Sequence, residues 1–247
     1  MTTMTDQNPD VIDLNAHMDI SPVHNASATW LDATAHPPKK MGLSMILLLC
    51  WVLVGLCLSA MVTAPLPLPH WFSRLFSSIA VFPDSATLTY SFQVPIVLWL
   101  SAVFGRRYAC IAVALYLALG LAGLPVFANG GGWTYVFEPG IGYLAGLLFC
   151  PMLMSNTINQ GFRNSRNLAS VLLVFVPMAV LTGVLTIHIL GVVGLIVQWS
   201  FGLMPLETCR QWIVQLTLLP VFYDFAFGYL LVSLTRVFRT LFWLAFY

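Results

Sequence analysis

The sequence predicts an all-α integral membrane protein, and its composition and charge pattern both support this fold class. The chain has 247 residues, of which 59% are hydrophobic and only 8% are charged, whereas a soluble globular domain carries about 25% charged residues. Its mean hydropathy is +0.87. Apolar segments, of which residues 42–64 are long enough to cross a bilayer, are separated by connections, several of which contain lysine or arginine. Together these features predict six transmembrane helices in one compact bundle.

The polarity of the chain changes near residue 40 and predicts two regions. Residues 1–40 are polar and interrupted by prolines, so we expect a disordered tail. Residues 41–247 form the predicted membrane domain. The histidines and aspartates of the tail match no metal-binding spacing, and the sequence predicts no metal site and no cofactor.

Six apolar segments are the predicted membrane helices: residues 42–64, 92–104, 108–121, 140–154, 168 to about 199, and 221 to about 236. The segment 65–90 is expected to be a long connection with a short amphipathic turn at residues 71–76. The segment 200–219 is expected to be a short amphipathic or re-entrant segment, so that the last helix begins after Pro220.

The basic residues orient this six-helix arrangement. With six crossings, most of them fall on one side of the membrane, and Arg74 and Arg210 fall on the other. The positive-inside rule then places both termini in the cytoplasm. The glycine-rich segment 119–146, the connection 65–90 and the start of the sixth helix are expected to meet on the outer side, around an outward-facing pocket.

Glycine and proline are concentrated in residues 119–146, which cannot continue a helix throughout. Irregular backbone within a membrane is tolerated where it is buried in protein or lines a cavity, so we expect a structured loop near a ligand site. Asn129 in this loop is either a ligand contact or a turn residue. Trp133 and Tyr143 offer aromatic surface to a ligand.

Asp224 and Gln93 are the main polar candidates within the apolar segments. Ionisable groups in membrane helices are costly and mark functional sites, which favours Asp224 as a ligand contact. The alternative is a capping carboxylate in the first turn of a helix that starts after Pro220. Gln93 is either a ligand contact or an interhelical hydrogen-bonding residue. His188 is expected to be a buried packing residue.

Small residues predict two close helix contacts. Ala60 and Ala64 give a small-xxx-small pattern in the first helix, and Gly142 and Gly146 give a flat face in the fourth. Enzyme motifs such as GxSxG, HExxH and Walker A are absent from the sequence, and the near-zero net charge argues against nucleic acid as a partner. The sequence therefore predicts a non-enzyme that moves or binds a solute.

Three blocks of the sequence resemble the BioY family, the biotin-binding S components of energy-coupling factor (ECF) transporters. The blocks are residues 104–107 with 114–128 (ALYLALGLAGLPVFA), residues 138–146 (EPGIGYLAG) and, more weakly, residues 219–224 (LPVFYD). The resemblance covers roughly residues 42–240. It implies an S-component-like bundle in the inner (plasma) membrane that captures biotin from outside, a transmembrane coupling protein and a pair of ATPases as partners, and docking of the coupling protein on the face of Ala60 and Ala64.

The chemistry of biotin suits the candidate residues. The ureido ring offers two N–H donors and one carbonyl acceptor, which Asp224 and Asn129 match, and its fused rings require an apolar wall with few polar groups. Family members carry a lysine three residues after this aspartate, where this chain has Phe227. Arg210 or Arg74 is therefore the expected partner of the ligand carboxylate.

Three other functions are considered. The first is an S component for a different vitamin, because the family lysine is missing. The second is an integral-membrane enzyme, for which Asp224 and His188 are nearly the only embedded ionisable groups. The third is a purely structural membrane subunit, which would not explain the glycine-rich segment.

Overall fold

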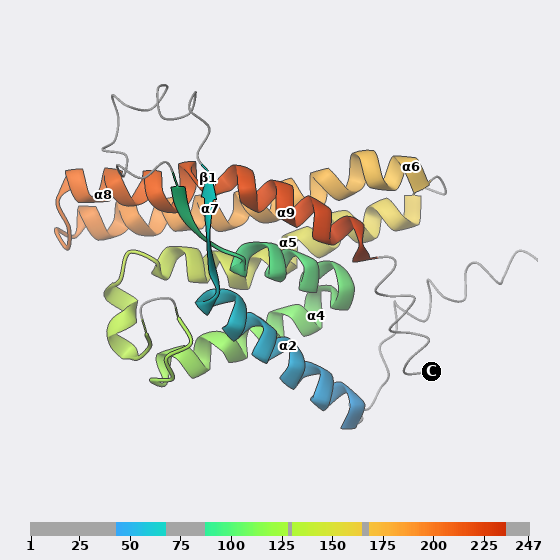
Figure 1. Ribbon diagram of the computed structural model, residues 1–247, viewed down its shortest axis with the longest axis horizontal. Coiled ribbons are helices and arrows are strands. Elements are labelled where there is room, and N and C mark those ends of the chain that lie inside the picture. Colours follow the sequence, from blue (N-terminus) through green and yellow to red (C-terminus); the bar gives the residue numbers. More distant parts are fainter. Residues whose placement is uncertain (1–42, 68–86, 128–129, 165–167, 236–247) are drawn as a thin grey trace, which may run out of the picture. The chain divides into compact units, whose positions relative to one another are not determined.

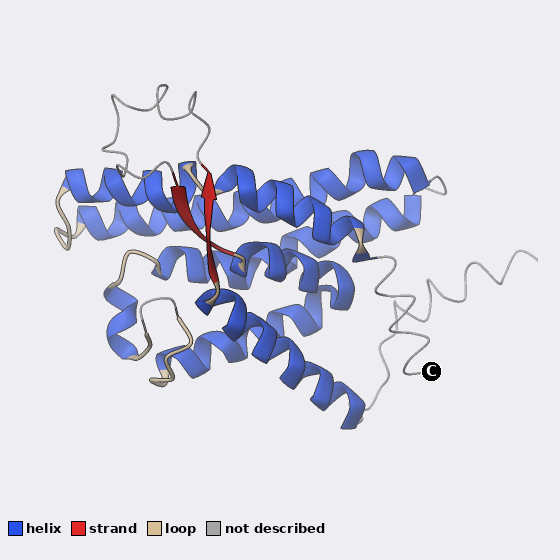
Figure 2. Cartoon of the chain, viewed as in Figure 1, coloured by secondary structure: helices blue, strands red, loops and turns tan. Residues whose placement is uncertain are grey.

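The computed structural model describes residues 43–67, 87–127, 130–164 and 168–235, and the described residues from Ile46 on belong to one compact unit. Nearly all of this part is helical, with one pair of strands (Figures 1 and 2). Four helices are long and apolar enough to cross a membrane: Gln93–Leu121, Ile141–Gly161, Val171–Ser200 and Leu206–Ser233. A shorter apolar helix covers Leu49–Met61.

The first helix, α2 (Leu43–Met61), ends three residues before the predicted boundary at residue 64. The chain then forms strand β1 (Thr63–Pro67), which pairs antiparallel with β2 (Thr87–Ser91) and places Ala64 opposite Tyr90. The predicted connection over residues 65–90 therefore begins and ends in a pair of strands that the sequence did not predict. Pro65 and Pro67 oppose helix formation but are tolerated in a two-stranded edge. The expected amphipathic turn at residues 71–76 lies outside the described residues.

The helix α4 (Gln93–Leu121) contains a sharp break at Gly105 (φ 73°, ψ 178°). Figure 1 shows its ribbon changing direction partway along its length. These dihedral angles are accessible to glycine and almost no other residue. The break falls between the two segments, 92–104 and 108–121, that the sequence predicts as separate helices.

The glycine-rich segment forms a structured turn between α4 and α5 (Ile141–Asn164). Phe127 and Gly130 exchange backbone hydrogen bonds, and Gly132 N–H donates to the Gly120 carbonyl. A short 3₁₀ helix, η2 (Trp133–Phe137), completes the turn. The loop is therefore held by its own backbone, as expected for irregular structure inside a membrane protein.

The helices α5 and α7 (Val176–Ser200) pack closely through glycine. A Cβ atom added at Gly142 would lie 2.8 Å from the Leu190 carbonyl oxygen, and one at Gly146 would lie 2.7 Å from Ile187 Cα. The predicted flat face at these two glycines is confirmed. The helix α5 extends ten residues beyond its predicted end at residue 154 and reaches Asn164. The short α6 (Leu168–Ser170) and the π-helical η3 (Val171–Phe175) lead into α7.

The C-terminal part of the described chain is one long helical run. It comprises α8 (Leu206–Ile213), the π-helical η4 (Val214–Leu218) and α9 (Val221–Ser233). The expected amphipathic segment is present as α8, but the helical run begins there and not after Pro220. Pro220 itself has α-helical dihedral angles, because a proline is tolerated where the run changes from one helix to the next.

Apolar side chains cover the outside of the helices as well as the core. The helices α4, α5, α7 and α9 supply most of the buried residues, whereas Phe149, Leu173, Ile189 and Phe222 are among the large apolar side chains that remain exposed. A helix that is apolar on all sides is stable in a hydrocarbon environment but not in water. This distribution matches a multi-pass membrane protein.

Candidate functional site

Asp224 lies at the centre of a buried polar cluster formed by three separate elements. Its side chain, on α9, belongs to a residue only 2% exposed. The Tyr90 hydroxyl, on β2, donates a hydrogen bond of 2.6 Å to Oδ1. The His188 Nε2 atom, on α7, lies 3.0 Å from Oδ2. Each carboxylate oxygen therefore has its own partner. Asp224 lies in the first turn of α9, as the capping alternative expects, while its two oxygens contact Tyr90 and His188.

The electrostatics of the cluster explain why both partners are needed. A carboxylate removed from water without partners is very unfavourable, whereas hydrogen bonds to an ionised group are roughly twice as strong as neutral ones. With its proton on Nε2, His188 donates to Oδ2 of Asp224. Burial raises the pKa of the Tyr90 hydroxyl, and the negative charge of Asp224 raises it further. Tyr90 therefore remains a neutral donor.

Tyr143 adds a second polar contact beside this cluster. Its ring lies edge-on to the ring of His188, with 6.0 Å between the centroids. Its hydroxyl lies 2.7 Å from Thr217 Oγ1 in the π-helical η4. Single-turn π-helices often occur at functional sites. The structure thus brings two of the sequence candidates, Asp224 and Tyr143, into contact with one histidine.

Gln93 belongs to a separate hydrogen-bond chain that reaches the glycine-rich segment. Its Nε2 atom donates to the Tyr116 hydroxyl at 3.1 Å, and that hydroxyl donates to the Val126 carbonyl, also at 3.1 Å. Gln93 and Tyr116 lie on opposite sides of the break at Gly105, so the predicted interhelical hydrogen bond is confirmed. Through it, the start of α4 is connected to the entrance of the loop that contains Asn129.

An aromatic cluster covers the Tyr90 side of Asp224. The Phe227 ring centroid lies 5.7 Å from that of Tyr90 and 5.2 Å from that of Phe92. Tyr223 packs on Tyr90 at 5.8 Å, and its hydroxyl donates to the Pro67 carbonyl of β1. Phe227 is therefore an apolar wall residue of the cluster.

The remaining candidates do not gather at Asp224 in the described part of the chain. Trp133 is 72% exposed. Arg210, on α8, is exposed and lies 3.7 Å from Glu207 one turn away. Asn129 and Arg74 lie outside the described residues.

The two alanines predicted as a docking face do not share a helix. Ala60 is 2% exposed and belongs to the core of the chain, whereas Ala64 lies in β1, beyond the end of α2. The predicted helical face at these residues was wrong because the prolines after Ala64 favour the strand.

Sequence reasoning missed the roles of Tyr90 and His188. The sequence predicts a buried packing role for His188 and no contact for Tyr90, and the two residues lie 36 and 134 positions from Asp224. One signal was available for His188. Ionisable side chains within membrane segments tend to pair with one another. His188 is the other ionisable residue that lies well inside a predicted membrane helix, so it was a candidate partner of Asp224. No sequence signal located Tyr90.

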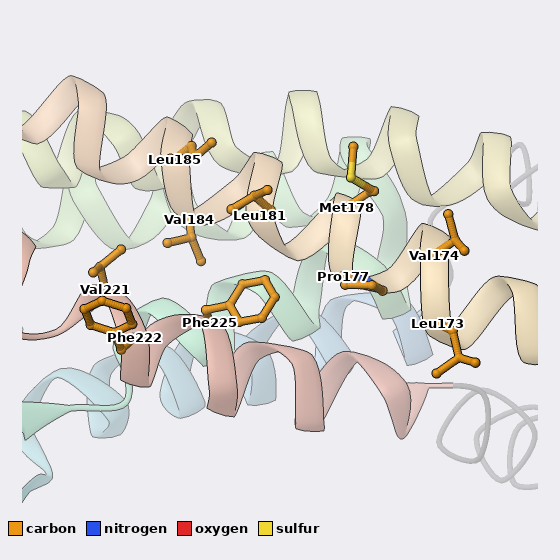
Figure 3. A pocket seen from close by; sticks show the side chains of 10 residues that line it. All are labelled: Leu173, Val174, Pro177, Met178, Leu181, Val184, Leu185, Val221, Phe222 and Phe225. Carbon is orange, nitrogen blue, oxygen red and sulfur yellow. The ribbon is translucent and has the colours of Figure 1, made fainter. Parts of the chain in front are cut away.

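An apolar groove of about 480 Å³ lies between α7 and α9 (Figure 3). Its lining residues are Leu173, Val174, Pro177, Met178, Leu181, Val184, Leu185, Val221, Phe222 and Phe225. None of them has a polar side chain. Ligand sites need a few placed polar groups as well as apolar walls, so the buried Asp224 cluster is the better candidate.

Comparison with known proteins identifies the family of the chain. The model of the BioY family matches residues 72–242. The "Probable biotin transporter BioY" of Lysinibacillus sphaericus is 34% identical over 71 residues, which is 29% of this chain and 36% of that protein. The "Biotin transporter BioY" of Thermotoga maritima is 43% identical over 60 residues, 24% of this chain and 36% of that protein. The chain thus matches about a third of the length of each relative.

A solved structure shares the fold. It is the S-component for biotin from an ECF-type ABC transporter, with a TM-score of 0.57 and 22% sequence identity, covering 83% of this chain and 95% of that chain. At this identity the likeness concerns the fold. The family match, in contrast, covers more than half of the sequence. This chain belongs to the BioY family.

Proposed function

We propose that this chain is the substrate-binding membrane subunit of a biotin uptake transporter, and that it binds biotin at Asp224. The observation that carries the proposal is a buried carboxylate in a membrane-spanning helix of a BioY family member. The ureido group of biotin presents two N–H donors, which a carboxylate accepts. Tyr143 and Phe227, whose ring packs on that of Phe92, supply the apolar wall that the fused rings require.

The membrane topology that fits this function has six crossings with both termini in the cytoplasm. The break at Gly105 supports it, because it divides α4 into two helical halves separated by Arg106 and Arg107. These cations, with the other basic residues of the intervening loops, then lie on the cytoplasmic side of the plasma membrane. The glycine-rich segment faces outward and covers the site, with Asn129, Trp133 and Gln93 as further ligand contacts and Arg210 as the partner of the ligand carboxylate.

Transport requires release on the inside. The chain contains no Walker A motif, so we propose that it works with a transmembrane coupling protein and a pair of ATPases. Because Ala60 is buried in the core, the docking face on the first helix would use its exposed residues, such as Trp51, Leu58 and Met61.

Binding of biotin to the purified chain in detergent tests the proposal. Isothermal titration calorimetry should show saturable binding of biotin and of desthiobiotin, which keeps the ureido ring. Asp224→Ala should lower the affinity at least a hundredfold, since two buried N–H donors then lose their acceptor. Failure of the folded chain to bind biotin would contradict the proposal.

One observation favours a different vitamin as the substrate. Phe227, where the family resemblance implies a lysine, is packed among the rings of Tyr90 and Phe92, so no ammonium group is available there for a ligand carboxylate. Calorimetry with biotin amide, which lacks the carboxylate, measures whether a cation of the chain binds that group. Equal affinities for biotin and its amide would show that no cation, Arg210 included, binds the carboxylate.

A further inference from the structure

Both oxygens of Asp224 are already occupied by donors of the chain itself. Tyr90 donates to Oδ1 and His188 Nε2 lies against Oδ2, and all three residues are buried. A ligand that donates N–H groups to this carboxylate therefore meets two donors that it has to join or replace. Either Tyr90 or His188 then has to give up its contact with Asp224.

The two donors are anchored very differently. His188 lies in the middle of α7, within the membrane-spanning helix Val171–Ser200, which packs closely on α5. Its backbone is fixed by that packing, so His188 can leave Asp224 only by rotation of its own side chain. Tyr90 lies in the five-residue strand β2 of a two-stranded sheet. An isolated pair of strands is marginally stable, so β2 can shift at lower cost than α7.

The same strand pair is tied to α9 at a second point. The Tyr223 hydroxyl, on α9, donates to the Pro67 carbonyl of β1. The two tyrosine hydroxyls thus connect β1 and β2 to one helix, but only Tyr90 touches the carboxylate. Removal of the Tyr223 hydroxyl would therefore loosen the strands without freeing the carboxylate, whereas removal of the Tyr90 hydroxyl would free Oδ1 of Asp224.

We infer that the Tyr90 hydroxyl and a ligand N–H compete for Oδ1 of Asp224, whereas His188 stays bound and holds the carboxylate in position. This inference rests on the proposed function, because it assumes that the ligand binds at Asp224. It makes His188 a positioning residue and Tyr90 a residue that limits ligand affinity. The neutral phenol suits this role, because it can leave the carboxylate without moving a charge.

The prediction is a pair of effects with opposite signs. Tyr90→Phe removes the competing donor and keeps the ring among Phe92, Tyr223 and Phe227. We expect it to raise the affinity for biotin about tenfold, since a hydrogen bond to a charged group is worth at least that factor. His188→Leu should lower the affinity about tenfold or more. His188→Gln should recover part of the loss, because its amide can donate from a similar position.

The matched control is Tyr223→Phe. It removes a tyrosine hydroxyl from the same aromatic cluster and frees β1 from α9, but it leaves both partners of Asp224 in place. We expect its biotin affinity to equal that of the wild type. All variants are compared by calorimetry in one detergent, and the thermal midpoint of each verifies that it is folded.

Three results would overturn the inference. An unchanged or lower affinity in Tyr90→Phe would show that its hydroxyl does not compete. An equal gain in Tyr90→Phe and Tyr223→Phe would assign the effect to loosening of the strands. A folded His188→Gln as weak as His188→Leu would deny His188 its positioning role. If the wild type itself binds no biotin, the proposed function fails, and the inference fails with it.

Discussion

At the scale of single residues, hydrogen bonding decides which polar groups the membrane domain can bury. Asp224 has a partner at each carboxylate oxygen, from Tyr90 and His188, and Gln93, Tyr116 and the Val126 carbonyl form a second hydrogen-bond chain. The Nδ1 atom of His188 is buried without a partner in the described residues. In a medium without water, each lost partner leaves a group that nothing else can solvate. Substitutions in these clusters should therefore act through the groups left behind as well as through the group removed.

Tyr116→Phe tests the second cluster. It removes the hydroxyl that connects Gln93 to the Val126 carbonyl and leaves both without their partner. We expect the free energy of unfolding to fall by about 1–3 kcal/mol, measured as a lower thermal midpoint in detergent. Gln93→Met removes only the amide that donates to the Tyr116 hydroxyl, and this hydroxyl keeps its own hydrogen bond to the Val126 carbonyl. Additive effects in the double variant would contradict a shared network, because coupled residues give non-additive energies.

At the scale of secondary-structure elements, glycine determines where helices bend and where they touch. Gly105 breaks α4 at a positive φ, and Gly146 lets α5 approach α7. Glycine is needed at position 105 for its backbone conformation, whereas it is needed at position 146 because a side chain there would collide with α7. Gly55, in α2, requires neither, because a Cβ atom added there would meet nothing within 4 Å.

Gly146→Ala should force α5 and α7 apart. The new methyl group would lie 2.7 Å from Ile187 Cα, a backbone atom that cannot rotate away. We expect a loss of about 1–3 kcal/mol in the free energy of unfolding, seen in thermal denaturation. Gly55→Ala is the matched control and should be neutral or stabilising, since alanine favours helix over glycine. Equal midpoints for the two variants would contradict the close contact.

Gly105→Ala should destabilise the chain for a conformational reason alone. No atom lies within 4 Å of the added Cβ, but alanine is strained at φ 73° and ψ 178° by about 1–3 kcal/mol. The measurement is again the thermal midpoint, compared with that of Gly55→Ala. An unchanged midpoint would mean that α4 straightens without cost, and the two halves would then not be separate crossings.

At the scale of the whole molecule, the charge distribution decides how the proposed bundle sits in the membrane. Arg106 and Arg107 follow directly on the break in α4, whereas Trp133 lies in the glycine-rich turn after its second half. If each half of α4 crosses the bilayer, these two places face opposite sides. All three side chains are exposed in the described structure.

Cysteine labelling tests this orientation. In a background without the five native cysteines, Trp133→Cys should react with a membrane-impermeant maleimide in intact cells, and Arg107→Cys should react only after the cells are opened. Labelling of both from the same side would contradict a crossing between Gly105 and the turn. Biotin binding by the cysteine-free parent verifies that the background is functional.

The sequence by itself determined the membrane class, the family and roughly where the apolar segments lie, because these depend on local composition and on motifs read within a few residues. The end of α5 and the start of the last helical run differ from the predicted bounds. It also singled out Asp224, since a lone carboxylate in an apolar segment is conspicuous. Only the tertiary structure decided what surrounds Asp224. Tyr90 and His188 approach it from 134 and 36 residues away, and such contacts follow from the packing of β2, α7 and α9. The same holds for the strand that replaces the end of the first helix, because β1 exists only where β2 pairs with it.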